Sequence, residues 1–108
     1  MSLVITHEAI PLQASADGVV RVAGTRVTLD TVVAAFEEGA TAEEIVQQYP
    51  TLGLADTYAA IGYYLRHRPE VEAYLERRRQ DANEARRKNA ARRGDAALRA
   101  RLLARRTL

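Results

Sequence analysis

The sequence predicts a mainly α-helical protein with an N-terminal β-hairpin, a three-helix bundle of the helix-turn-helix type and a long basic C-terminal helix. Three observations support this fold class. Residues 9–22 contain two short β-prone runs, residues 28–65 show three closely spaced amphipathic patterns, and the composition becomes strongly basic after Glu76. We therefore expect a hairpin and helix-turn-helix-like domain over residues 1–75, called the body, and a helical or partly disordered extension over residues 76–108, called the arm.

The hairpin is predicted from a turn signal between the two β-prone runs. The runs AIPLQ and VVRVA flank residues 14–18, where the step from Asp17 to Gly18 has the chemistry of a tight turn. Pro11 has no N–H to donate, so the first strand should lie at an edge. A ribbon of two strands is marginal by itself in water, so it must pack on the helices or join a second subunit. For this reason we expect a homodimer.

The first two helices have clear start and stop signals. Thr28 is the expected N-cap of the first helix, and Gly39 is its expected stop. Thr41 and Glu44 have the spacing of a capping box at the start of the second helix. Pro50 should end that helix.

A third helix is expected from about Leu54 to Leu65. Its buried stripe is predicted to contain Leu54, Tyr58, Ile61 and Leu65. Its outward positions are predicted to be Ala55, Asp56, Ala59, Ala60 and Tyr63. The link to the second helix is short and forces a steep crossing, which is the helix-turn-helix geometry. These outward positions offer few groups that read bases, so this helix is a weak candidate for sequence-specific DNA recognition.

Charge is divided unequally along the chain. The net charge is +2, but the arm holds twelve basic and four acidic side chains, a net charge of +8, so the body carries −6. Such a division is typical of a tail that meets a polyanion or an acidic protein surface. A self-neutralising, solvated helix is the simpler alternative.

The arm is expected to be a projecting helix that becomes ordered on contact. Pro69 suits the first turn of this fourth helix. Between Arg77 and Arg93 the apolar residues are all alanines, so no tertiary burial offsets the cost of ordering. We expect Gly94 and Asp95 to interrupt the helix. The candidate residues for binding a partner or nucleic acid are Arg77, Arg78, Arg79, Arg86, Arg87, Lys88, Arg92, Arg93, Leu98 and Leu102.

Catalytic and cofactor chemistry has little support in the sequence. The chain has no cysteine, and His7 and His67 lie far apart without the spacing of a metal-binding motif. No glycine-rich loop follows a strand to hold phosphate. We predict no enzyme, no cofactor and no metal. Long apolar stretches are also absent, so we expect no membrane span and a cytoplasmic location.

A combination of short motifs resembles a known family. The motifs are a strand that ends in Gly-Thr-Arg, a helix ended by glycine, a capping-box helix and a Tyr-Pro turn, carried by Gly24, Thr25, Arg26, Thr41, Glu44, Tyr49 and Pro50. Over residues 9–68 this order resembles the bacterial family called domain of unknown function 433. The resemblance implies an antitoxin of a toxin-antitoxin pair that binds a PIN-like ribonuclease toxin. The arm lies outside the resemblance.

Together these observations predict a small regulatory binding protein. It would neutralise a PIN-like nuclease by direct binding, and operator DNA is a second candidate ligand. Two alternatives stay open: a non-specific nucleic-acid-binding protein that acts through the arm, and a structural adaptor dimer. For Arg26, a structural role is the stronger expectation, through an ion pair with Asp30, Glu43 or Glu44.

Overall fold

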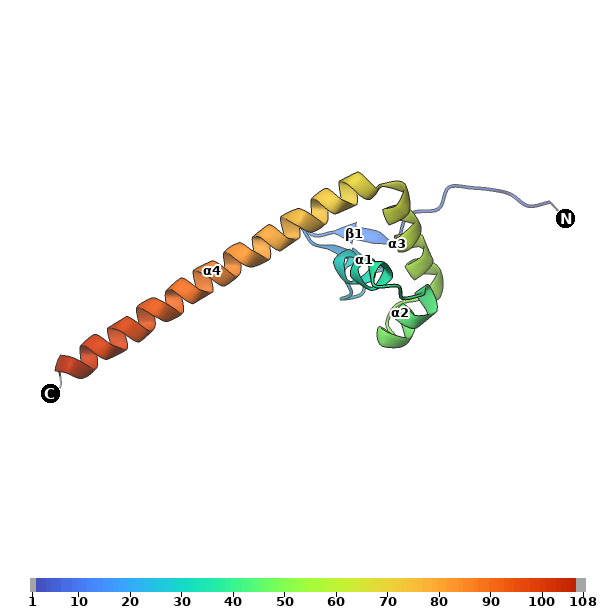
Figure 1. The fold of residues 1–108 in the computed structure, drawn as a ribbon. Helices are drawn as coiled ribbons and strands as arrows, with labels where there is room; N and C mark the ends of the chain where they lie inside the picture. The colour runs from blue at the N-terminus through green and yellow to red at the C-terminus, as the bar shows by residue number, and fades with distance from the viewer. Residues whose placement is uncertain (1, 107–108) are drawn as a thin grey trace. The chain divides into compact units, whose positions relative to one another are not determined.

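The computed structural model describes residues 2–106 (Figure 1). Over this range it contains two strands and four helices: β1 (Leu12–Ala14), β2 (Val20–Val22), α1 (Leu29–Glu37), α2 (Ala42–Gln48), α3 (Leu54–Arg66) and α4 (Arg68–Arg106). The predicted fold class is confirmed, because an N-terminal antiparallel hairpin precedes four helices and the last helix is long. The chain forms two compact units, Met1–Val71 and Glu72–Leu108, and the arm lies within the second.

The hairpin forms where the turn signal places it. Leu12 lies opposite Val22 in the antiparallel register. The Ser15 amide donates to the Val19 carbonyl at 2.9 Å, and Gly18 adopts a φ of 81° in the turn between the strands. The Ser15 hydroxyl also donates to the Asp17 carboxylate, which lowers the pKa of Asp17.

The Gly-Thr-Arg motif was expected to end the strand, but β2 ends at Val22 and the motif instead belongs to a second tight turn that leads toward α1. Ala23 and Gly24 have φ values of 52° and 68°, and the Thr25 amide donates to the Val22 carbonyl at 3.0 Å. Two consecutive positive φ values inside such a bond are the pattern of a type I′ turn, which explains the glycine. The Thr25 hydroxyl donates to the same carbonyl at 2.7 Å and accepts from the Val27 amide at 3.1 Å. The motif therefore shapes the backbone.

Arg26 follows this turn and is exposed. Its side chain follows the turn that ends β2, and the expected ion pair with Asp30, Glu43 or Glu44 stays a prediction.

The helix caps agree with the predicted signals. The Thr28 hydroxyl accepts from the Thr31 amide at 3.3 Å at the start of α1, and Gly39 follows the helix with a φ of 98°. At the start of α2, the Thr41 hydroxyl accepts from the Glu44 amide at 3.1 Å. The Glu44 carboxylate accepts from the Thr41 amide at the same distance, so the predicted capping box is confirmed.

The body has a small aliphatic core between the hairpin and the helices. β2 packs on α1 and α3, and α3 packs on both α1 and α2. The buried apolar side chains are Val19, Val22, Leu29, Val32, Val33, Ala42, Ile45, Leu52, Ala60, Ile61, Tyr64 and Val71. Most are small or branched, as the low aromatic content leads us to expect.

The predicted buried face of α3 is wrong by one residue. The buried side chains are Thr57, Ala60, Ile61 and Tyr64, whereas Leu54, Tyr58 and Leu65 are 43%, 52% and 49% exposed. Ala60, predicted to face outward, is fully buried. A shift of one residue turns a helix by about 100°. The observed face includes Ala60 and Thr57, whose small side chains let α3 approach its neighbours closely. The larger side chains of Leu54, Tyr58 and Leu65 remain exposed.

The predicted interruption of α4 is also wrong. The helix continues through Gly94 and Asp95 to Arg106, and Pro69 lies in its first turn as expected. A glycine inside a helix costs only about 1 kcal/mol relative to alanine. The neighbouring alanine and arginine residues favour the helix, so a single glycine does not end it.

Candidate nucleic-acid and protein interface

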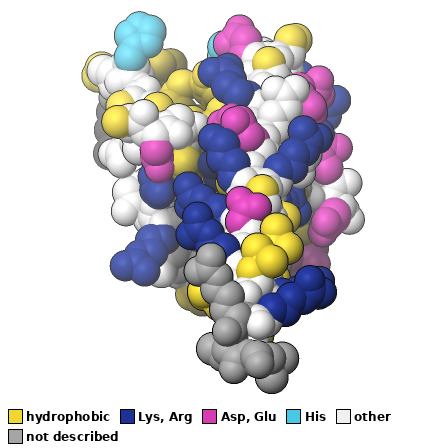
Figure 2. Space-filling view, turned by 90° about the vertical axis from the view of Figure 1, so that its left-hand side faces the viewer, with side chains coloured by type: hydrophobic (Ala, Val, Ile, Leu, Met, Phe, Trp, Pro, Cys, Tyr) yellow, Lys and Arg dark blue, Asp and Glu magenta, His cyan; other side chains and the backbone are white. Residues whose placement is uncertain are grey.

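The predicted binding residues all lie on α4. The seven arginines and the lysine of this set are exposed, except for Arg78, which is half-buried. Figure 2 shows lysine and arginine side chains crowding the surface around the C-terminal end, with fewer acidic ones among them. The sequence therefore identified a surface that is open to solvent and strongly basic.

Arginines recur along α4 at the spacing of a helical face. Arg79, Arg86 and Arg93 are separated by seven residues, which is close to two turns and places them on one side about 10.5 Å apart. Arg92 and Arg99 form a second row with the same spacing. A rigid helix can thus present guanidinium groups at regular intervals to an extended acidic partner.

Local contacts hold some of these side chains but do not neutralise the arm. Arg79 lies 3.1 Å from the Glu76 carboxylate, and Lys88 lies 3.3 Å from that of Glu84. Exposed pairs at three- or four-residue spacing contribute little free energy, since water and salt screen them. Arg86 donates to the neutral Asn83 side chain at 2.9 Å and keeps its full charge. A partner's carboxylates or phosphates can therefore compete for the arm.

The last turns of α4 add an apolar patch to the basic surface. Leu98, Leu102 and Leu103 are 56%, 52% and 60% exposed. Leu98 and Leu102 are four residues apart and share a helical face. The patch agrees with the predicted role of these two leucines in binding a partner, and that role stays a prediction.

The outer surface of α3 is poor in groups that read bases. Ala55 and Ala59 are exposed and apolar, and Asp56 is half-buried. Tyr58 is bound to α2, because its hydroxyl donates to the Glu43 carboxylate at 2.5 Å. This bond lowers the pKa of Glu43 and raises the pKa of Tyr58.

A polar cluster that sequence reasoning missed joins α1, α3 and the start of α4. The Tyr64 hydroxyl donates to the Glu37 carboxylate at 2.5 Å, and the Arg68 guanidinium lies 3.5 Å from the same carboxylate. Arg68 also lies over the Tyr64 ring, 5.2 Å from its centre. The sequence separation of 27 residues between Glu37 and Tyr64 leaves no local pattern from which to predict this contact.

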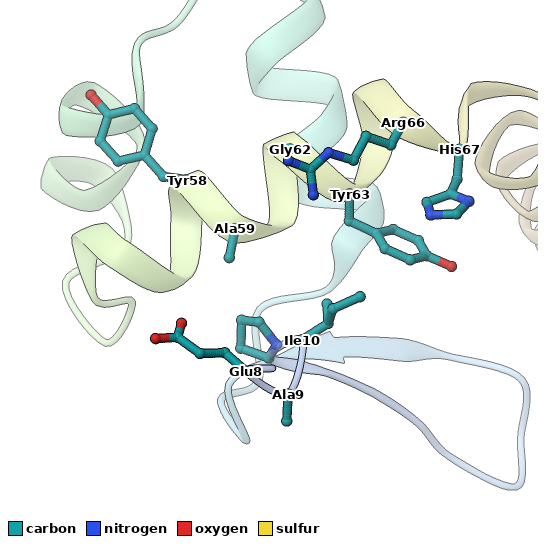
Figure 3. A pocket seen from close by; sticks show the side chains of 10 residues that line it. Glu8, Ala9, Ile10, Tyr58, Ala59, Gly62, Tyr63, Arg66 and His67 are labelled. Atoms are coloured by element: carbon teal, nitrogen blue, oxygen red, sulfur yellow. The ribbon is translucent and has the colours of Figure 1, made fainter. Parts of the chain in front are cut away.

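A pocket of about 400 Å³ lies between the segment before β1 and the outer side of α3. Figure 3 shows Glu8, Ala9 and Ile10 on one side and Ala59, Gly62 and Tyr63 on the other. Its remaining walls are Pro11, Tyr58, Arg66 and His67. The rings of Tyr63 and His67 stack with centres 4.4 Å apart. The sequence did not predict this pocket, because its two sides, residues 8–11 and residues 58–67, are far apart in the chain.

Neither a metal-binding cluster nor a membrane-spanning helix is found among the described residues. Across residues 2–106, no three or more acidic or histidine side chains come together in a way that would hold a metal ion. Within the same part of the chain, none of the helices combines the length and apolar character that a membrane span needs.

The fold and the exposed arm define a class: a small hairpin-and-helix domain that continues into a basic helix. Residues 14–64 match the family model described as "Protein of unknown function (DUF433)", which supports that family for the domain. The match runs from the end of β1 to Tyr64 and leaves the arm outside. Comparison with curated proteins gave no match, and comparison with solved structures gave none either.

Proposed function

We propose that this chain is a non-enzymatic regulatory protein of the antitoxin kind, which neutralises a PIN-like nuclease by binding it directly. In this proposal the protein is cytoplasmic and bacterial, and the arm is the main binding element. The body provides homodimerisation and a secondary contact with operator DNA. The resemblance of the Gly-Thr-Arg, capping-box and Tyr-Pro motifs to the family supports the class of partner.

The observation that carries the proposal is the separation of charge between the arm and the body. The arm has a net charge of +8 on a helix whose described side chains are nearly all exposed, and the body has −6. A helix of 39 residues that buries few side chains gains little stability from packing. Its composition is therefore better explained by a partner than by the fold.

The arginine rows suit a cleft lined by carboxylates. Guanidinium groups form two parallel hydrogen bonds with a carboxylate, and PIN-like active sites are clusters of carboxylates. A cluster of carboxylates requires positive charge nearby, and guanidinium groups such as those of Arg86 and Arg93 would supply that charge. An arm in this cleft would block the substrate and silence the nuclease.

The proposed secondary contact with DNA involves the body. The short link between α2 and α3 is compatible with the helix-turn-helix type that the sequence suggests. The acidic body and the bare outer face of α3 favour a weak contact without strong sequence preference.

A second candidate function is non-specific nucleic-acid binding through the arm. Its support is the regular spacing of exposed arginines, which can neutralise phosphates without reading bases. The absence of aromatic residues after Tyr74 argues against base stacking on single strands, so duplex phosphates are the favoured target. A purely structural adaptor dimer is the third possibility, in which neither ligand binds the arm.

Truncation after Leu75 tests the proposal. The expected partner is a PIN-like nuclease encoded directly beside this chain, and the full chain and the truncated chain are each co-expressed with it. We expect co-purification and inhibition of RNA cleavage with the full chain only. Equal co-purification by both chains would overturn the role of the arm. Binding of the full chain to duplex DNA alone, with affinity that falls steeply as salt rises, would support the second candidate instead.

A further inference from the structure

The exposed large apolar residues of the body are confined to two neighbouring regions. One is the segment before β1, with Leu3, Val4, Ile5 and Ile10, and the other is the outer side of α3, with Leu54, Tyr58 and Leu65. The pocket of about 400 Å³ lies where these regions meet. The pocket thus touches each region at one residue, Ile10 before β1 and Tyr58 on α3.

Every residue of the segment Ser2–Ala9 is exposed, although Glu8 and Ala9 line the pocket beside α3. The segment forms no strand, and no backbone hydrogen bond is found within it or between it and the rest of the described chain. The side chains of Leu3 and Ile5 are each 87% exposed. In Figure 1 the segment leads away from the helices toward the N-terminus. Three consecutive apolar residues in an extended chain thus have their side chains and their backbone groups available.

The pocket matches this segment in chemistry. Its walls are mainly apolar and aromatic, with Ala59, Gly62 and Tyr63 of α3 at its centre (Figure 3). Residues 2–6 of the segment carry no charge. No charged group of the segment would therefore have to be desolvated when these residues enter the pocket, although the charged side chains of Glu8 and Arg66 belong to its wall.

The chain cannot easily fill its own pocket. Glu8 already forms part of the wall, so Leu3 to Ile5 would have to reverse direction within Thr6 and His7. The segment from Ser2 to Glu8 contains no glycine, proline, asparagine or aspartate, which tight turns prefer. Its β-branched residues favour an extended chain instead.

We propose that Leu3, Val4 and Ile5 of one copy occupy the pocket of a second copy, and that the second copy returns the same contact. Eight extended residues span up to about 26 Å, enough to reach a neighbouring molecule. The exchange around a two-fold axis buries Leu3, Val4 and Ile5 and the pocket of both copies, and such self-complementary contacts are typical of symmetric dimers. This inference specifies the interface for the homodimer in the proposed function, and it does not involve the arm.

Two variants with matched controls test the exchange, using the full chain without any partner. The segment variant is Val4→Asp with Ile5→Asp, and its control is Leu98→Asp with Leu102→Asp on the arm. The pocket variant is Gly62→Phe, and its control is Gly62→Ala. A Cβ at Gly62 meets no atom within 4 Å, so the larger side chain extends into the pocket without disturbing the core. Replacing a helical glycine also favours α3. Thermal unfolding checks that every variant is folded.

Sedimentation equilibrium measures the dimer dissociation constant. We expect both test variants to weaken the dimer at least 100-fold and both controls to leave it within threefold of the unmodified chain. An equimolar mixture of the two test variants should form a heterodimer, because one intact segment meets one intact pocket. A monomeric unmodified chain would overturn the proposal, and so would a dimer that both variants leave unchanged. Weakened homodimers without recovery in the mixture would also overturn the exchange. Every one of these results leaves the test of the arm unaffected.

Discussion

The hydroxyl of Tyr64 in α3 donates a 2.5 Å hydrogen bond to the carboxylate of Glu37, the last residue of α1. Tyr64 is only 3% exposed, and Arg68 lies over its ring. This bond joins the end of α1 to the last turn of α3. Arg68 lies 3.5 Å from the same carboxylate, so its positive charge offsets one of the acidic groups of the body.

Substitution of Tyr64 by phenylalanine should lower the free energy of unfolding by about 1 kcal/mol, because it removes one hydrogen bond to a charged acceptor and keeps the buried ring. Urea unfolding of the single variants and of the double variant with Glu37→Gln measures the coupling between the two side chains. Purely additive effects would show that the contact contributes nothing. Phe36 packs edge-on against the Tyr64 ring. Phenylalanine at position 64 keeps a ring for this contact, so the change in the free energy of unfolding reports on the hydroxyl.

The pH dependence of stability should contain a contribution from Tyr58 and Glu43. The hydrogen bond lowers the folded-state pKa of Glu43, so its stabilisation is present above about pH 4.5 and is lost as the pH falls through the lowered pKa. The pKa of Tyr58 is raised, so its part is present below about pH 10 and is lost at higher pH. Thermal unfolding of Tyr58→Phe should be measured across this pH range. Its unfolding temperature should depend less on pH at the acidic and the alkaline limit than that of the unmodified chain. An unchanged profile in the variant would contradict the contact.

The turn at Ala23 and Gly24 should respond oppositely to two substitutions. Gly24→Val places a β-branched residue at a φ of 68° and should cost at least about 1 kcal/mol. Ala23→Asn should stabilise by about 0.5 kcal/mol, because asparagine tolerates positive φ and is preferred at this position of a type I′ turn. Chemical unfolding of both variants provides the comparison. A stabilising Gly24→Val would show that the turn does not form.

Local signals made much of this fold predictable. The capping box of Thr41 and Glu44 and the turn at Gly18 depend on residues close in sequence, and each appears where it was expected. The orientation of α3 depends on which side chains allow close approach to other elements. Leu54 and Leu65 fit a helical stripe as well as Thr57 and Tyr64 do, so periodicity alone selected the wrong face.

The candidate sites likewise divide into those that the local sequence predicts and those that depend on the packing of distant residues. The basic arm is visible in the composition alone, and its arginines are exposed where the sequence placed them. The pocket beside Gly62 and the contact between Glu37 and Tyr64 join residues that are far apart in the chain. No spacing rule connects such positions. They become visible only when the helices are packed.

Inhibition of the proposed PIN-like nuclease partner by arm variants tests the central claim most directly. The variant replaces Arg79, Arg86 and Arg93 with glutamine, which keeps a similar helix propensity and removes one row of charge. Its control is Arg26→Gln in the body, an exposed arginine outside the arm. With RNA cleavage as the readout, we predict that the control inhibits like the unmodified chain and that the row variant needs at least a tenfold higher concentration. Equal inhibition by all three proteins would contradict the claim that the arm binds the nuclease.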